Sequence, residues 1–520
     1  MSLRRFAALS SVALGVLGPA VASAAELNLD QIGRYSVKDQ VTSISQFSDV
    51  RPTDWAYQAL SNLVERYGCV AGYPNGTYKG GQAMTRFEAA ALLNACLDRV
   101  TEVTDELSKL MKEFEKELAI LKGRVDGLEA RVGELEASQF STTTKLAGQA
   151  TFVLGANAFG GSATALKDEY RASFGATTFN YDVQLNFDTS FTGKDLLRTT
   201  LRAGNFGGDT NSFGGAGPSN LSQLEVAFQE DAGPNIVGID RLYYQFPVGK
   251  GFTVTAGGRV GQEDMLALWP SVYPDDTVLD VLTLNGAPAA YNKNLGPGAG
   301  LWWQGENGLS ISASYVAANG SNGNPAEGGV ATQGAGGTGT VQVGYAKEQW
   351  AIAAIWSYLQ NGNDAVAYYG TNFAVEQFAQ PGYTNAFALS GYWQPKETGW
   401  IPSISAGWGI NTANYTAGDV AGSVRTSQSW SISLQWLDAF AKGNAAGFAV
   451  GQPIFATSLY GGETPGDGNY VWEWWYKFQV TDNISVTPAL FYLSRPLGQD
   501  TPSGQSLSQL GGLVKTTFRF

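Results

Sequence analysis

The C-terminal part of the chain, residues 141–520, alternates polar and apolar residues along many short runs. The run from Asn180 to Asp188 alternates without an error, and stretches rich in Gly, Asn and Asp separate such runs. A period of two is typical of a β-strand whose two faces meet different surroundings. We count about 16 runs, to within about two. The others begin near Lys145, Leu196, Ile239, Phe252, Leu301, Leu309, Val341, Ala351, Thr384, Ile401, Ser429, Phe448, Val471, Ile484 and Gly511.

The alternation also assigns side chains to faces. In the run from Asn180 to Asp188, the apolar face holds Tyr181, Val183, Leu185 and Phe187, and the polar face holds Asp182, Gln184, Asn186 and Asp188. Arg198, Arg202, Arg241 and Arg259 fall on the polar face of later runs. We therefore expect these four arginines, with Asp182 and Asp188, to line a water-filled channel.

Alternating strands suit either a soluble β-sandwich or a membrane β-barrel. The pattern persists over a longer stretch than one ordinary sandwich needs. Aromatic residues gather at run ends, as in the girdles of a membrane interface; they are Trp302–Trp303, Tyr392–Trp393, Trp472, Trp474–Trp475 and Phe491–Tyr492. Because backbone groups in a bilayer must pair internally, spanning strands close into a barrel. The pattern favours a mainly β fold, a transmembrane antiparallel β-barrel of about 16 strands, preceded by α-helical segments.

The longest early connection between predicted strands, from Arg259 to Leu301, is acidic. It contains Glu263, Asp264, Asp275, Asp276 and Asp280. Connections of this length are usually functional or disordered. One hypothesis is a constriction loop in the lumen, with Asp275, Asp276 and Asp280 set across from the arginines in a field that favours small ions. The alternative is an external loop with solvated charges.

Residues 97–140 follow a heptad period. Apolar residues recur in alternating steps of three and four from Leu97 to Leu135, with Thr104 as the one polar position of the seam. Such a seam predicts a coiled coil that joins several chains, in a rod of about 60 Å. The alternative is a lone amphipathic helix packed on the preceding domain. The mixture of Leu, Val and Phe leaves the number of strands in the coil open.

Residues 25–96 combine helical spacing with turn chemistry. Pro74-Asn75-Gly76 forms a turn, and Thr85 with Glu88 makes a capping box for a second helix. The segment therefore predicts a small helix–loop–helix unit.

The motifs of this unit resemble a surface-layer-homology domain. They are Phe47-Ser48-Asp49-Val50, Trp55-Ala56, Gly72-Tyr73-Pro74-Asn75-Gly76-Thr77-Tyr78 and Thr85-Arg86-Phe87-Glu88. The resemblance implies binding to an anionic, peptidoglycan-linked cell-wall polymer. Arg86 would supply the cation, because its planar fork suits carboxylates, with Asp49, Trp55 and Thr85 around it. The alternative is that Arg86 and Glu88 only cap a helix. One copy is present where several are usual, which weakens binding by a single chain.

The N-terminus indicates export. Arg4 and Arg5 precede an apolar run that ends at Val21, and Ala22-Ser23-Ala24 is a small-x-small site. This predicts a signal peptide over residues 1–24, with a membrane anchor as the alternative. In an oxidising compartment, Cys69 and Cys96 are a disulfide candidate; otherwise they are two buried thiols.

Composition and charge narrow the function further. Only 15% of the residues are charged, below the roughly 25% of ordinary globular chains. The 46 acidic residues against 33 basic ones leave a net charge of −13, which disfavours nucleic acid as a partner. The chain contains no His, which removes His-based triads and His-ligated metal sites. We expect no enzyme, no cofactor and no metal.

Taken together, the three segments resemble the cyanobacterial-type outer-membrane porins, which are grouped as iron-uptake or carbohydrate-selective porins. The last run, which ends at Phe520, resembles the assembly signal of bacterial outer-membrane barrels. The resemblance implies a homotrimer in outer-membrane lipid, a periplasmic N-terminal domain and passive diffusion of small hydrophilic solutes and inorganic ions. Two alternatives remain open: a carbohydrate-selective pore with a lumenal aromatic track, and a mainly structural staple between the outer membrane and the cell wall.

Overall fold

The computed structural model describes residues 143–520, except 208–210, 215–216, 275–276, 362–363 and 377. Nearer the N-terminus it describes positions 45, 48–53, 57, 61, 64–65, 77–78 and 112. The chain divides into two compact units, one with residues 1–15 and 140–520 and the other with residues 16–139. The predicted signal peptide, the heptad seam, Cys69 and Cys96 lie outside the described residues.

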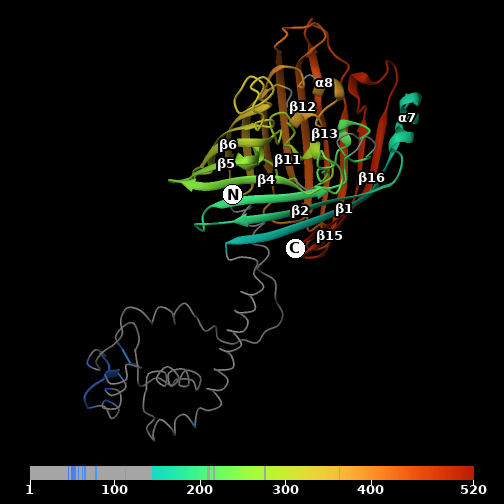
Figure 1. Ribbon diagram of the computed structural model, residues 1–520. Helices are drawn as coiled ribbons and strands as arrows, with labels where there is room; N and C mark the ends of the chain where they lie inside the picture. The colour runs from blue at the N-terminus through green and yellow to red at the C-terminus, as the bar shows by residue number, and fades with distance from the viewer. Residues whose placement is uncertain are drawn as a thin grey trace. The chain divides into compact units, whose positions relative to one another are not determined.

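The described residues from 143 onward form one closed antiparallel barrel of 16 strands, each paired with its neighbours in the sequence (Figure 1). This confirms the predicted mainly β fold. Each predicted run overlaps one strand. The strands are β1 (Thr144–Gly160), β2 (Thr178–Thr189), β3 (Leu196–Gly204), β4 (Gly238–Val248), β5 (Phe252–Gly261), β6 (Leu295–Gln304), β7 (Leu309–Ala317), β8 (Gly337–Ala346), β9 (Trp350–Gln360), β10 (Gly382–Trp393), β11 (Ser403–Tyr415), β12 (Val424–Leu437), β13 (Ala445–Leu459), β14 (Tyr470–Thr481), β15 (Ile484–Ser494) and β16 (Ser508–Arg519).

The barrel closes where β1 pairs with β16, and Figure 1 shows the turquoise first strand beside the red last strands. The backbone of Phe520 extends this ladder by one residue: its N–H donates to the Gly148 carbonyl at 3.0 Å, and its own carbonyl accepts the Gly148 N–H at 2.6 Å. Closure leaves no unpaired strand edge, which a bilayer requires.

The connections at one end of the barrel are shorter on average than those at the other end. Short turns occupy one end, at residues 190–195, 249–251, 305–308, 347–349, 394–402, 438–444 and 482–483. Longer connections occupy the other, at residues 161–177, 205–237, 262–294, 318–336, 361–381, 416–423, 460–469 and 495–507. Because outer-membrane barrels carry short periplasmic turns and longer external loops, we name the two ends periplasmic and external.

Short helices lie within the long connections. They are α7 (Thr164–Phe174), α8 (Asn372–Glu376), η4 (Asn220–Ser222), η5 (Gln262–Met265), η6 (Asp280–Thr283), η7 (Asp364–Val366) and η8 (Gly498–Asp500). In the part of the chain that the structure describes, no helix is both long and apolar enough to cross a membrane.

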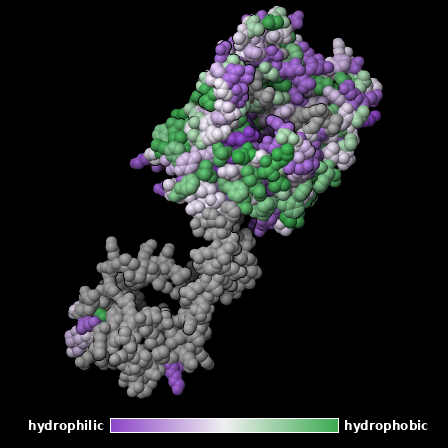
Figure 2. Space-filling view, viewed as in Figure 1, coloured by the Kyte–Doolittle hydropathy of each residue, from purple (hydrophilic) through white to green (hydrophobic). Residues whose placement is uncertain are grey.

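The outer wall of the barrel is apolar because the strands alternate. On β9, Trp350, Ile352 and Trp356 are exposed, whereas Ala351 and Ala353 between them are buried. Figure 2 shows apolar residues over parts of the barrel wall and many hydrophilic residues toward its upper rim.

The aromatic residues at run ends divide between the two faces. Trp393 and Trp474 are exposed on the outer wall. Their neighbours Trp302, Tyr392, Trp475 and Phe491 are buried, because adjacent residues of a strand point to opposite faces. Four of the nine aromatic residues that suggested a membrane girdle therefore contribute to the interior.

Candidate functional site: the charged interior of the barrel

Residues 262–294, here called the inner segment, lie inside the barrel. The N–H of Ala267 donates to Ser312 Oγ of β7 at 2.9 Å, and the N–H of Val272 donates to Ser405 Oγ of β11 at 3.0 Å. Farther along, the Lys515 Nζ of β16 donates to the Thr277 carbonyl at 2.6 Å. Only a segment within a closed barrel reaches strands from so many parts of its wall.

Small polar side chains of β7 to β12 form the wall against which the inner segment packs. Gln262 donates to Thr340 of β8 and Ser357 of β9, and Ser390 of β10 donates to the Asn285 carbonyl. Short Ser and Thr side chains let the backbones approach closely. The wall is buried along its length, at Ser310, Ser312, Thr338, Thr340, Gln342, Ser357, Ser390, Ser405, Asn411, Ser427, Ser429, Ser431 and Ser433. This side of the interior is therefore filled.

A second connection, residues 205–237, packs on the inner segment. The N–H of Glu225 donates to the Val278 carbonyl, and the N–H of Asp280 donates to the Gln223 carbonyl. Apolar side chains of both segments share one buried cluster, which includes Phe206, Phe213, Leu221, Leu224, Leu279, Leu282, Leu284 and Tyr291. The two segments together form an internal body that leaves less room for solutes than an empty barrel.

Charged side chains gather on the opposite side of the interior, on β2, β3 and β4. Arg198 forms two hydrogen bonds to the Asp188 carboxylate, at 2.8 and 2.7 Å, and Arg202 Nε donates to Asp182 at 2.7 Å. The register pairs Asp188 directly with Arg198. The two pairs thus follow from the alternation of β2 and β3.

Arg241 of β4 contacts three carboxylates through three different nitrogens. Its Nη1 lies 2.9 Å from Asp240, its Nη2 lies 2.8 Å from Glu263, and its Nε lies 3.0 Å from Asp264. Asp240 sits where the β3–β4 register shifts, so it is carried toward the interior beside Arg241. Glu263 and Asp264 belong to η5, at the start of the inner segment.

Lys293, near the end of the inner segment, forms ion pairs with two acidic side chains. Its Nζ lies 3.3 Å from Glu225 and 3.4 Å from Asp280. The acidic inner segment was expected to face the arginines across an open lumen. Instead, Glu263 and Asp264 bond Arg241 directly, and Asp280 bonds Lys293. Asp275 and Asp276 lie outside the described residues.

The inward assignment of Arg259 is wrong. A register shift after Gly257 sets Arg259 opposite Leu242, which is exposed on the outer wall. Val260 then faces inward and packs with Tyr243 and Met265. The inserted residue of a β-bulge reverses the facing of the residues beyond it in the strand, so Arg259 belongs to the outer face. Its Nε is buried, with no hydrogen-bond partner among the described residues.

Several charged residues of the interior carry no signal in the alternation pattern. Glu225 and Lys293 lie in connections, and Asp240 lies at a bulge. Glu473 and Lys515 do occupy inward positions of β14 and β16 and are buried. In the sequence, a charged residue amid apolar neighbours was the signal that could have identified both of them as interior residues.

Glu263 and Asp467 are among the acidic groups outside the strands whose pKa values are raised. Burial raises the pKa of the Glu263 carboxyl, although the Arg241 guanidinium acts in the opposite direction. Burial also raises the pKa of Asp467, whose carboxylate accepts hydrogen bonds from Thr371, Ala456 and Gln499. Asp467 thereby ties together connections at the external end.

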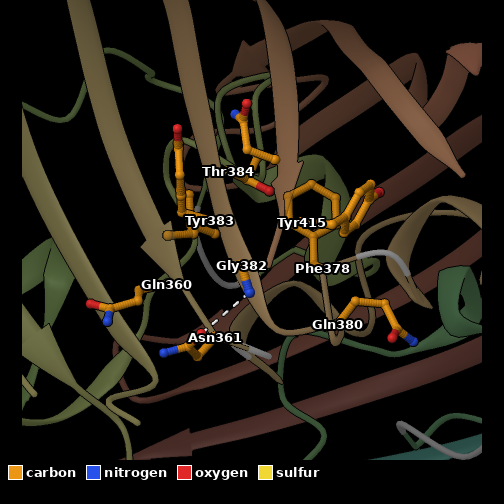
Figure 3. A pocket seen from close by; sticks show the side chains of 10 residues that line it. Gln360, Asn361, Phe378, Gln380, Gly382, Tyr383, Thr384 and Tyr415 are labelled. Atoms are coloured by element: carbon orange, nitrogen blue, oxygen red, sulfur yellow. Dashed lines mark hydrogen bonds between the residues drawn. The ribbon is translucent and has the colours of Figure 1, made fainter. Parts of the chain in front are cut away.

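A small pocket lies at the external ends of β9, β10 and β11 (Figure 3). Phe378, Tyr383 and Tyr415 contribute to its lining, and the N–H of Gly382 donates to Asn361 Oδ1 at 3.3 Å. It is separate from the charged side of the interior, which lies on β2 to β4.

The N-terminal unit is described at few positions. The Asp49 carboxylate accepts the backbone N–H of Tyr78 at 2.6 Å, which joins the first motif to the Gly-Tyr turn motif. Trp55, Thr85 and Arg86 lie outside the described residues. Among the described residues, no group of three or more acidic or cysteine side chains is arranged to hold a metal ion.

A closed antiparallel barrel with an apolar outer wall and charges inside is the architecture of an outer-membrane porin. A family model described as "Carbohydrate-selective porin, OprB family" matches residues 102–520, and one described as "S-layer homology domain" matches residues 46–90. The chain therefore belongs to the OprB family of porins and carries an S-layer homology domain. The predicted resemblance to outer-membrane porins with such a domain is confirmed.

Similar proteins match this chain over most of their own length. The uncharacterized protein alr4550 of Nostoc sp. is 36% identical over 95% of this chain and 88% of its own. The uncharacterized protein sll0772 of Synechocystis sp. is 33% identical over 93% of this chain and 91% of its own. Among solved structures, Pseudomonas putida OprB is 14% identical with a TM-score of 0.47, and it covers 75% of this chain and 96% of that chain.

Proposed function

We propose that small hydrophilic solutes and inorganic ions diffuse through this outer-membrane porin along the charged side of its interior, beside β2, β3 and β4. One contrast supports this route. The side chains of Arg198 and Asp188 are 26% and 25% exposed and that of Arg241 is 20% exposed, whereas Ser312 and Ser357 on the opposite wall are at most 1% exposed. Inside a closed barrel, the remaining accessible space therefore borders the charged side chains.

A carbohydrate-selective pore is the second candidate, because the family carries that description. Sugar recognition would be favoured by aromatic rings whose faces are open to the passage. The inward rings of Trp302, Tyr392, Trp475 and Phe491 are each less than a tenth exposed. Packing against the interior thus leaves these four rings little face for a sugar, and the charged lining supports ions and small polar solutes.

For the N-terminal part of the chain, we propose attachment to the cell wall. Residues 25–96, in the periplasm, would bind a peptidoglycan-linked polymer through Arg86, with Asp49, Trp55 and Thr85 nearby. Residues 97–140 would form a coiled coil in a homotrimer. Three linked domains bind more tightly than one, because the second and third contacts form at high effective concentration. We assign no catalysis to the chain, in keeping with a family of pores.

Planar-bilayer recording of the purified full-length protein tests permeation. We expect stable ion conductance, together with liposome swelling that declines steeply from small to larger sugars. A sealed barrel that still binds purified cell wall would instead support the structural staple. Binding of the Arg86→Gln variant to the same cell-wall preparation tests attachment, since loss of binding with intact conductance separates the two activities.

A further inference from the structure

The interior contains an ion-pair network in which acids outnumber bases. Its seven carboxylates and four cations leave three negative charges in excess. The members are Asp182, Asp188, Glu225, Asp240, Glu263, Asp264 and Asp280 with Arg198, Arg202, Arg241 and Lys293. The excess is unevenly placed: Arg198 and Arg202 each have one acidic partner, whereas Arg241 has three and Lys293 has two.

The excess lies around Arg241, which contacts the start of the inner segment, and around Lys293, near the end of that segment. Glu263 interacts electrostatically with both Arg241 and Lys293, so the two acid-rich groups are neighbours. The second oxygen of Glu263, Oε2, has no hydrogen-bond partner among the described residues. With Glu263 protonated, six carboxylates would still face four cations.

The side chains of this network border accessible space. Glu225, Glu263 and Lys293 are 24%, 21% and 19% exposed, and Arg241 lies beside them. Charges of one sign in a narrow, low-dielectric passage concentrate the opposite ion from solution. Because Arg241 and Lys293 are shared among five acids, they offset only part of the acidic field.

We propose that this passage prefers cations to anions, and that Arg241 and Lys293 limit how strong the preference is. The inference rests on the proposed permeation along β2, β3 and β4. Removing either cation then raises the preference, and removing one of their acidic partners lowers it. Since salt screens the field over about 10 Å at 0.1 M, the preference also grows as the salt concentration falls.

The test is the K⁺ to Cl⁻ permeability ratio of the full-length protein, from reversal potentials in a KCl gradient across a planar bilayer. We expect a ratio above unity that increases roughly two- to fivefold in Arg241→Gln and in Lys293→Gln, and that falls in Glu225→Gln. Lys347→Gln is the matched control: it removes the same charge from a periplasmic turn, where Lys347 bonds the Asn307 carbonyl, and leaves the ratio unchanged.

The outcomes separate this inference from the proposed function. An open channel with a ratio at or below unity, or equal ratios in wild type, Arg241→Gln and Lys293→Gln, overturns the cation preference and leaves the porin intact. A folded barrel without conductance overturns the proposed function. A difference in migration between unheated and heated protein in detergent gels identifies folded variants. Lys293→Gln, which changes a residue outside the strands, serves if Arg241→Gln does not fold.

Discussion

The carboxylate of Glu473, on β14, accepts the backbone N–H of Leu279, in the inner segment, at 2.6 Å. Its other oxygen accepts the Tyr273 hydroxyl at 2.7 Å, and that hydroxyl accepts the Trp475 indole N–H at 2.7 Å. One buried side chain of the wall thus holds two points of the inner segment. The position of the segment, and with it the width left for solutes, depends on this anchor.

Replacing Glu473 should loosen the inner segment. In Glu473→Leu, the Leu279 N–H loses its buried acceptor, which costs about 1–3 kcal/mol, so we expect larger single-channel currents, more current noise and a lower melting temperature in detergent. Glu473→Gln keeps one carbonyl oxygen as acceptor and should lie between Leu and wild type. Quiet, wild-type currents in a folded Glu473→Leu protein would show that the anchor does not position the segment.

The opposite facing of two arginines gives opposite mutational effects. Arg202→Leu leaves the fully buried Asp182 carboxylate without its cationic partner, with only the Gln184 amide still donating to it, which destabilises by about 3–5 kcal/mol. Arg259→Leu removes a charge from the outer wall, so stability should be unchanged or greater and conductance unaffected. Denaturant unfolding in detergent and bilayer recording of both variants measure this. A changed conductance in Arg259→Leu, with unchanged conductance in Arg202→Leu, would contradict the outer position of Arg259 and show that it lines the passage.

Acidification should weaken the cation preference. Because burial raises the pKa of Glu263, its carboxylate is neutralised at a higher pH than an ordinary glutamate, and one negative charge is lost from the network as the pH falls. We expect the K⁺ to Cl⁻ permeability ratio to decline as the pH falls, already at pH values above those at which an ordinary glutamate is neutralised. Glu263→Gln should start from a lower ratio and show a smaller decline. Equal pH profiles in the two proteins would assign the decline to other carboxylates.

The last residue should stabilise the barrel through its backbone more than through its ring. Deleting Phe520 removes both main-chain hydrogen bonds to Gly148, and we expect a loss of about 1–3 kcal/mol in unfolding free energy. Phe520→Ala keeps these bonds and serves as the control, with a smaller loss. Denaturant titration of both proteins compares them. If the deletion variant is no less stable than Phe520→Ala, the two hydrogen bonds to Gly148 do not stabilise the pairing of β1 with β16.

Much of the barrel was predictable from local pattern. Alternation such as that of Asn180 to Asp188 repeats in each strand, because a strand at a boundary between lipid and a polar interior must present two different faces. The pairs of Arg198 with Asp188 and Arg202 with Asp182 arise from two such strands in register. The same logic failed at Arg259, because the one-residue bulge after Gly257 leaves no mark in the pattern and reverses the facing.

The sequence by itself determined the class of fold, the approximate number of strands and the apolar outer wall, since each depends on a period of two that is local to every strand. Only the tertiary structure decided which charges meet. Arg241 reaches Glu263 and Asp264, and Lys293 reaches Glu225, because two connections fold back into the barrel. Glu473 reaches Leu279 across the interior for the same reason. Contacts between residues so far apart in the chain have no periodic signal, and they arise only once the barrel has closed around its own loops.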